Sequence, residues 1–191
     1  MADDPILDFL KAVDDELARH AEEGERLDLH LLGRSALILG YSARLMTKDV
    51  DVVEVAGSRL LGIAVRVFGK GGPGHRAWGF YLETVSSGLP PLPLGYQSRC
   101  IDVPGPWSVI RPKRPEAHDL VISKLRRFHL GDREDVQILC DAGDLSPATL
   151  RERIDLAFAF HADEDEDPHR KKAYSNLRIV IAYLEGKRRG I

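Results

Sequence analysis

The chain has 191 residues, a formal charge of −3 and 43% hydrophobic residues. This length suits one compact domain, or a core with a helical appendage, and the weak negative charge gives no overall attraction to nucleic acid, so nucleic-acid binding would need a local basic patch. No stretch is apolar enough to span a bilayer, the acidic start lacks a secretory n-region, and Cys100 and Cys140 are too few and too far apart for a zinc knuckle. We therefore expect a cytoplasmic protein without a membrane partner.

The first half of the chain predicts alternating helices and strands. Apolar residues from Ile6 to Leu17 recur at helical spacing, and residues 27–32 read as a strand that ends at the glycine of Gly33-Arg34-Ser35. The apolar residues 36–39 then favour the start of a helix. Such a turn presents backbone N–H groups and a positive dipole end, which suits phosphate, and the Ser35 hydroxyl adds a donor.

Two acids follow in Thr47-Lys48-Asp49-Val50-Asp51-Val52-Val53. Successive residues of a strand alternate between its faces, so both carboxylates point the same way. Two like charges at this spacing favour a cation between them, and Mg²⁺ prefers oxygen ligands. The pair therefore predicts half of a magnesium site, although the same pattern also describes a half-buried strand with one wet face.

The middle of the chain is less regular. Residues 55–68 predict a helix, or a helix with a short strand, and the glycine-rich residues 69–75 lack the ending of a phosphate loop and predict a lid or a hairpin loop. A strand is expected at 80–85. Prolines at 90, 91 and 93 favour an extended connector, and two strands, 99–103 and 107–110, are expected around the turn at 103–106.

From Pro115 onward the pattern is helical. Four apolar faces are expected, formed by Leu120, Val121, Leu125 and Phe128, then by Val136 and Leu139, then by Leu150, Ile154, Ala157 and Phe158, and finally by Leu177, Val180, Ile181 and Leu184. We therefore expect an α/β (α+β) fold, with a small mixed sheet flanked by helices in residues 1–112 and a helical segment packed on this core in residues 113–191.

Taken together, Gly33-Arg34-Ser35-Ala36, Gly40 and Arg44-x-x-Thr47-x-Asp49-x-Asp51 resemble the signature of the polymerase-beta-type nucleotidyltransferase superfamily. More narrowly, the chain is similar to small bacterial nucleotidyltransferase-like proteins, some of which act as toxins in toxin-antitoxin and abortive-infection systems. The resemblance spans roughly residues 27–140 and implies a nucleotidyltransferase-type sheet. The group usually has glycine or serine where this chain has Arg34, which could crowd the phosphate loop or add a charge to it.

The resemblance implies a site with a third carboxylate from a later strand. Glu83 is the first candidate, the alternative being an edge-strand glutamate in solvent, and Glu54 and Asp102 are fallbacks. The implied catalytic residues and Mg²⁺ ligands are Asp49, Asp51 and Glu83. Nucleotide contacts are implied for Gly33, Arg34, Ser35, Arg44, Thr47 and Lys124.

Three expectations about charged residues each leave two roles open. Lys124 lies among apolar residues, so it either snorkels from a packed helix or aims at an acidic cleft, and the resemblance favours contact with nucleotide phosphate. Arg44 either acts likewise or pairs with Asp49. A further set of basic residues either forms a rim that binds an RNA acceptor or is scattered charge that keeps the protein soluble. The set is Arg111, Lys113, Arg114, Arg126, Arg127, His129 and Arg133.

The activity implied is magnesium-dependent transfer of a nucleoside monophosphate from a nucleoside triphosphate to an acceptor hydroxyl, with tRNA attacked by a toxin as the first choice of acceptor. The alternative is an inactive binding module with the same scaffold, which acts in a two-protein complex with a cognate partner.

Overall fold

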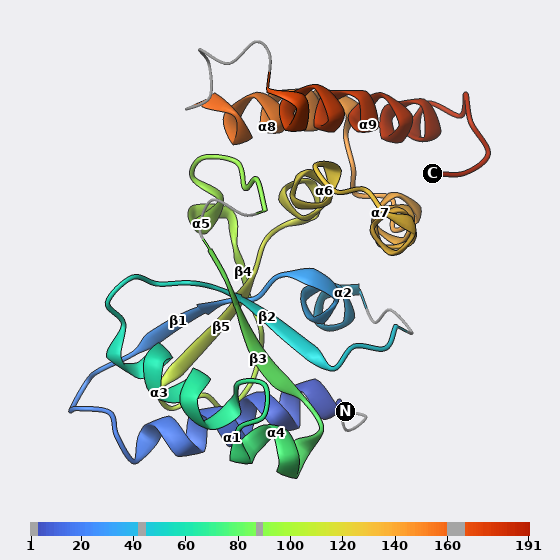
Figure 1. Ribbon diagram of the computed structural model, residues 1–191. Coiled ribbons are helices and arrows are strands. Elements are labelled where there is room, and N and C mark those ends of the chain that lie inside the picture. The colour runs from blue at the N-terminus through green and yellow to red at the C-terminus, as the bar shows by residue number, and fades with distance from the viewer. Residues whose placement is uncertain (1–3, 42–44, 87–89, 160–166) are drawn as a thin grey trace. The chain divides into compact units, whose positions relative to one another are not determined.

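The computed structural model describes residues 4–41, 45–86, 90–159 and 167–191, which contain nine helices and five strands. The chain forms two compact units, residues 1–87 with 100–114, and residues 88–99 with 115–191. The strands belong to the first unit, and the second unit is helical (Figure 1). The mixed α/β class with a small sheet and C-terminal helices is confirmed. Within these ranges, no helix combines the length and the apolar character needed to cross a membrane.

The first unit holds the strands and four helices. In chain order they are α1 (Pro5–Ala18), β1 (Leu27–His30), α2 (Gly33–Tyr41), β2 (Asp49–Val53), α3 (Arg59–Phe68), α4 (Pro73–Trp78), β3 (Tyr81–Val85), β4 (Ile101–Asp102) and β5 (Ile110–Arg114). The strands form two small sheets. One has the order β1-β5-β4, with β1 parallel and β4 antiparallel to β5, and the other pairs β2 with β3 in parallel.

A bridge between Leu31 and Val52 connects the two sheets. Beside it, the Leu32 amide donates a hydrogen bond of 2.8 Å to the Asp51 carbonyl. The segment that leaves β1 is therefore tied to the middle of β2, which places the turn at Gly33 next to the acidic strand.

Helix α1 supplies much of the core of this unit. The Asp4 side chain accepts a hydrogen bond from the Ile6 amide and caps the helix, Pro5 occupies the first turn, and Phe9 packs on Phe68 and Phe80 at 5.6 and 5.8 Å between ring centroids. The apolar face predicted from Ile6 to Leu17 is buried. Helix α3 resolves the uncertain stretch 55–68 as a helix that Ser58 caps.

A buried carboxylate determines where β5 begins. Asp14 of α1 is fully buried and accepts hydrogen bonds of 2.7 to 2.9 Å from the amides of Ser108, Val109 and Ile110 and from the Ser108 hydroxyl. The strand expected at 107–110 therefore begins only at Ile110 and runs to Arg114, because the amides of residues 108–110 donate to Asp14. The Trp107 indole donates to the Val103 carbonyl at 2.8 Å and closes the preceding loop.

The second unit is helical and consists of α5 (Tyr96–Arg99), α6 (Ala117–Leu125), α7 (Leu130–Asp141), α8 (Pro147–Ala157) and α9 (Pro168–Leu184). The predicted apolar positions from Leu120 to Ile154, together with Phe158, Leu177, Val180 and Ile181, are buried. Arg99 binds the fully buried Asp119 with two hydrogen bonds, of 2.9 and 3.1 Å, which attaches the segment 90–99 to α6.

Candidate active site

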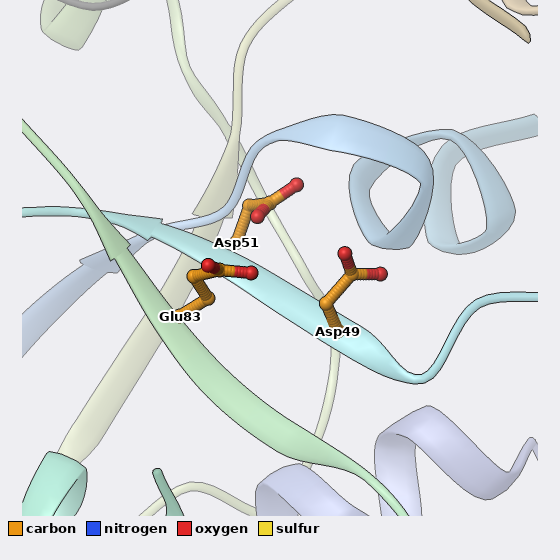
Figure 2. A group of neighbouring side chains, drawn as sticks. All are labelled: Asp49, Asp51 and Glu83. Atoms are coloured by element: carbon orange, nitrogen blue, oxygen red, sulfur yellow. The ribbon is translucent and has the colours of Figure 1, made fainter. Parts of the chain in front are cut away.

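Three carboxylates converge on one face of the β2–β3 pair. The parallel register places Asp49 beside Tyr81 and Asp51 beside Glu83, and Figure 2 shows the acids projecting from the two strands on the same side. One oxygen from each of Asp49, Asp51 and Glu83 lies within 4.8 Å of the other two. Asp49 and Asp51 are half-buried and Glu83 is exposed. The three acids, called the acidic triad below, are close enough to share one cation.

The electrostatics of the triad favour a hard cation. Three negative charges at this spacing repel one another, and in the described ranges neither Asp49 nor Glu83 forms an ion pair with lysine or arginine. The donor set is entirely carboxylate oxygen, which suits Mg²⁺ or Ca²⁺ better than the softer transition metals. The residues therefore fit the magnesium ion that the sequence suggested.

The turn that begins α2 is packed against the triad. Gly33 has a φ of +60°, and a β-carbon added to it would overlap Oδ2 of Asp51. Only glycine accommodates both this backbone conformation and this approach. The first N–H groups of α2 therefore begin beside the acidic cluster, as binding of phosphate next to a metal would require.

The other sequence-derived candidates in this unit lie around the turn. Ser35 is buried, and its hydroxyl donates to the Leu32 carbonyl at 2.8 Å, so it supports the turn from within. Arg34 is half-buried. The Thr47 hydroxyl contacts both the carbonyl and Oδ1 of Asp49 and so orients that ligand. Arg44 lies outside the described residues.

Lys124 belongs to the second unit. Its ammonium is 2.7 Å from Oδ2 of Asp135, and the side chains are 6% and 3% exposed. The charge of Lys124 is thus neutralised inside the helical unit by a carboxylate whose partnership the sequence pattern did not indicate.

The predicted basic rim is divided between the two units, and most of its members have partners. Arg111 and Lys113 form ion pairs with Asp28, Arg114 lies over the Tyr41 ring, and Arg127 binds Asp132. Of the fallback acids, Asp102 is 83% exposed and lies 4.0 Å from Lys113, and Glu54 is exposed. Glu83 is the acid that the geometry groups with Asp49 and Asp51.

The glycine-rich segment contributes groups that sequence reasoning missed. Instead of a lid or hairpin loop it starts α4, and its Lys70 and His75 pack on Tyr81 of β3, with Nζ 5.6 Å from the ring centroid and the imidazole at 5.0 Å. Partial burial and the charges of Asp49, Glu83 and Asp51 raise the pKa of Tyr81. For Tyr81, the sequence signal is its position two residues before Glu83, because residues two apart in a strand lie on the same face.

The sequence matches a known protein family over most of its length. The family described as nucleotidyltransferase of unknown function (DUF6036) matches residues 8–189. The chain belongs to this nucleotidyltransferase family. No curated protein and no solved structure gives a significant match. The family assignment agrees with the resemblance seen in the sequence and covers both units of the chain.

Proposed function

We propose that the chain is a magnesium-dependent nucleotidyltransferase that moves a nucleoside monophosphate from a nucleoside triphosphate to an acceptor hydroxyl. The observation that carries the proposal is the convergence of Asp49, Asp51 and Glu83 beside the Gly33 turn. One element offers oxygen ligands for a cation and the other offers N–H donors for phosphate. Membership of a nucleotidyltransferase family supports the reaction class.

The residues have separate tasks in this reaction. Asp49, Asp51 and Glu83 would hold Mg²⁺, which when bound polarises the α-phosphate and offsets charge on the departing pyrophosphate. Thr47 keeps Asp49 oriented. The Gly33–Ser35 turn binds the β- and γ-phosphates through backbone N–H groups, and Arg34 adds a positive charge at its rim.

Glu83 is the best placed of the three acids to serve the acceptor. It is exposed, whereas Asp49 and Asp51 are half-buried. Its carboxylate takes or orients the proton of the attacking hydroxyl. The acceptor oxygen then bonds to the α-phosphorus. The bond between the α-phosphorus and the oxygen that bridges it to the β-phosphorus breaks, and pyrophosphate leaves with the electron pair.

The experiment that tests the reaction uses the full chain with Mg²⁺, each of the four labelled triphosphates and total cell extract. We expect label to enter one class of macromolecule, and Asp51→Asn and Glu83→Gln to abolish it. The matched controls are Asp102→Asn and Glu54→Gln, which remove the same charges at acids outside the triad. Equal labelling by D51N and D102N would contradict the metal assignment.

A finer proposal concerns the biological role. We infer from the family resemblance that the protein acts as the toxin of a two-protein system, with tRNA as acceptor. Induced expression should then arrest growth in a way that D51N does not, and the label should be found in tRNA. Growth arrest by D51N to the same extent would contradict a toxic role for transfer.

A second function, a binding module that keeps the scaffold without transfer, is favoured by two contacts. The Ser35 hydroxyl is used by the Leu32 carbonyl and the Lys124 ammonium by Asp135, so two expected phosphate ligands have partners inside the protein. Calorimetry with Mg²⁺ and each triphosphate separates the two functions. Metal-dependent binding of one triphosphate supports the enzyme, and absence of binding to all four supports the module.

A further inference from the structure

We propose that Lys70, His75 and Tyr81 form the subsite for the acceptor, and that this acceptor is the phosphate-bearing end of an RNA strand. The inference rests on the proposed nucleotidyl transfer and names the residues that hold its acceptor. The three residues, called the β3 cluster below, lie in the segment from the glycine-rich stretch to the start of β3. The cluster combines two hydrogen-bond donors, the ammonium of Lys70 and the imidazole of His75, with the aromatic ring of Tyr81.

The β3 cluster and the Gly33–Ser35 turn lie on opposite sides of β2. The turn follows β1, which is bridged to β2 through Leu31 and Val52, whereas Tyr81 belongs to β3 on the other side of β2. Figure 2 shows the same order, with the start of α2 on one side of the acids and β3 on the other. The triad therefore separates the two groups of donors.

This arrangement matches the geometry of the reaction. In phosphoryl-type transfers the attacking and leaving oxygens lie roughly in line, on opposite sides of the phosphorus. When the Gly33 turn holds the leaving pyrophosphate, the acceptor hydroxyl arrives from the side of β3. Glu83 lies on that strand, two residues beyond Tyr81, so the acid that receives the proton is next to the β3 cluster.

Among the described residues, the ammonium of Lys70 and the Nε2 proton of His75 have no hydrogen-bond acceptor. Lys70 is exposed, and across the described ranges its ammonium contacts the Tyr81 ring and no carboxylate. His75 accepts a hydrogen bond from the Gly71 amide at Nδ1 (2.9 Å), which places the ring proton on Nε2. Within the same ranges Nε2 has no hydrogen-bond partner. Lys70 and His75 therefore remain able to bind an anionic oxygen.

The segment that carries the cluster is held firmly against β3. Gly69 forms a bridge with Leu82, and Gly74 lies so close to the Phe68 ring that a β-carbon would overlap it. Pro73 is the first residue of α4, and its fixed φ helps to set the position of His75 two residues later, in the same turn. Lys70 and His75 are thus held against Tyr81, the residue that β3 pairs with Asp49, before any ligand arrives.

The chemistry of the cluster selects among acceptors. A lysine beside an aromatic ring suits a nucleotide, because the ammonium pairs with a phosphodiester and the ring stacks with a base. The hydroxyl of an unmodified protein side chain brings neither a phosphate for Lys70 nor a base for Tyr81. An RNA end supplies the hydroxyl, the phosphate and the base together.

The test measures RNA binding apart from nucleotide chemistry. The full chain is titrated with a short fluorescent single-stranded RNA in the absence of triphosphate, at several salt concentrations. In a separate calorimetric arm, the chain is titrated with triphosphate in the presence of Mg²⁺. The variants are Lys70→Gln, Tyr81→Phe and Tyr81→Ala. The control is Arg26→Gln, which removes an exposed positive charge of the same unit just before β1, at the opposite end of that strand from Gly33.

We expect K70Q to weaken RNA binding about five- to tenfold and to reduce the salt slope by about one, while R26Q leaves both unchanged. Y81F should bind RNA like the parental chain and Y81A should bind it more weakly. Equal RNA affinities of K70Q and R26Q, or labelling of a protein or a small molecule in place of RNA, would overturn the inference. Failure of the proposed transfer shows separately, as absence of triphosphate binding in the calorimetric arm.

Discussion

Gly33 lies directly against the carboxylate of Asp51, so closely that a side chain at position 33 would occupy the space of Oδ2. The contact joins the start of α2 to the acidic triad. It makes the position of the Asp51 carboxylate, a proposed metal ligand, depend on the absence of a β-carbon in a neighbouring turn.

Gly33→Ala should therefore weaken Mg²⁺ binding and abolish transfer, and it should cost about 1–3 kcal/mol of stability, because φ at this position is +60°. Calorimetry with Mg²⁺ and urea unfolding measure the two effects. Gly24→Ala is the matched control, since Gly24 has a φ of +76° with open space around it. It should lose stability without losing metal affinity. Equal losses of metal affinity would show that the contact with Asp51 is irrelevant.

Removal of one charge from the triad should stabilise the metal-free protein. Each pair of like charges at this spacing costs about 1 kcal/mol or less in a solvated site, so Glu83→Gln should raise the unfolding midpoint slightly without Mg²⁺. Addition of Mg²⁺ should raise the midpoint of the parental chain and leave that of E83Q unchanged. Thermal unfolding with Mg²⁺ and with a chelator checks both statements, and Glu54→Gln, at an exposed acid outside the triad, should respond to Mg²⁺ as the parental chain does.

Asp14 should make stability depend on acid pH. Burial alone would raise its pKa, but the hydrogen bonds from Ser108, Ile110 and Val109 outweigh burial and lower the pKa from 3.8 to about 2. The depressed pKa corresponds to about 2 kcal/mol of stability, present above pH 4 and lost as the pH falls through about 2. Urea unfolding of the parental chain and Asp14→Asn should show a gap at pH 7 that narrows toward pH 2. A gap independent of pH would contradict this account.

Lys124 should prove necessary for stability. Lys124→Met removes the ammonium that lies 2.7 Å from the buried Asp135 carboxylate, which should cost about 3–5 kcal/mol, whereas the double variant Lys124→Met with Asp135→Leu should recover most of the loss. Urea unfolding measures both. The double variant should also keep its affinity for Mg²⁺ and triphosphate, measured by calorimetry. Loss of triphosphate affinity in the folded double variant would instead support the phosphate contact that the family resemblance implies.

The sequence predicts the local parts of this structure well, because they depend on local rules. Strand alternation places Asp49 and Asp51 on one face, and a glycine before an apolar run marks the beginning of α2. Helical spacing likewise identifies the buried faces of α1 and of the helices after Pro115. Each of these features is decided by residues a few positions apart.

Partners distant in the chain are what the sequence does not reveal. Asp14 takes the amides of residues 108–110, more than ninety positions away, and so overrides the strand pattern there. Helical periodicity places Lys124 on a face of α6 without indicating that Asp135 of α7 receives its charge. Lys70 reaches Tyr81 because the bridge between Gly69 and Leu82 attaches the chain to β3, and His75 reaches it from α4; a glycine-rich composition does not specify that path.

The hydrogen bond from the Leu32 amide to the Asp51 carbonyl gives the site a built-in spectroscopic probe. This proton is protected from solvent exchange as long as the chain leaving β1 stays attached to β2. Its exchange rate therefore measures how often the Gly33–Ser35 turn and the acidic triad separate in the native protein. That rate can be recorded by nuclear magnetic resonance without metal, nucleotide or acceptor, so the assembly of the site can be followed independently of its chemistry.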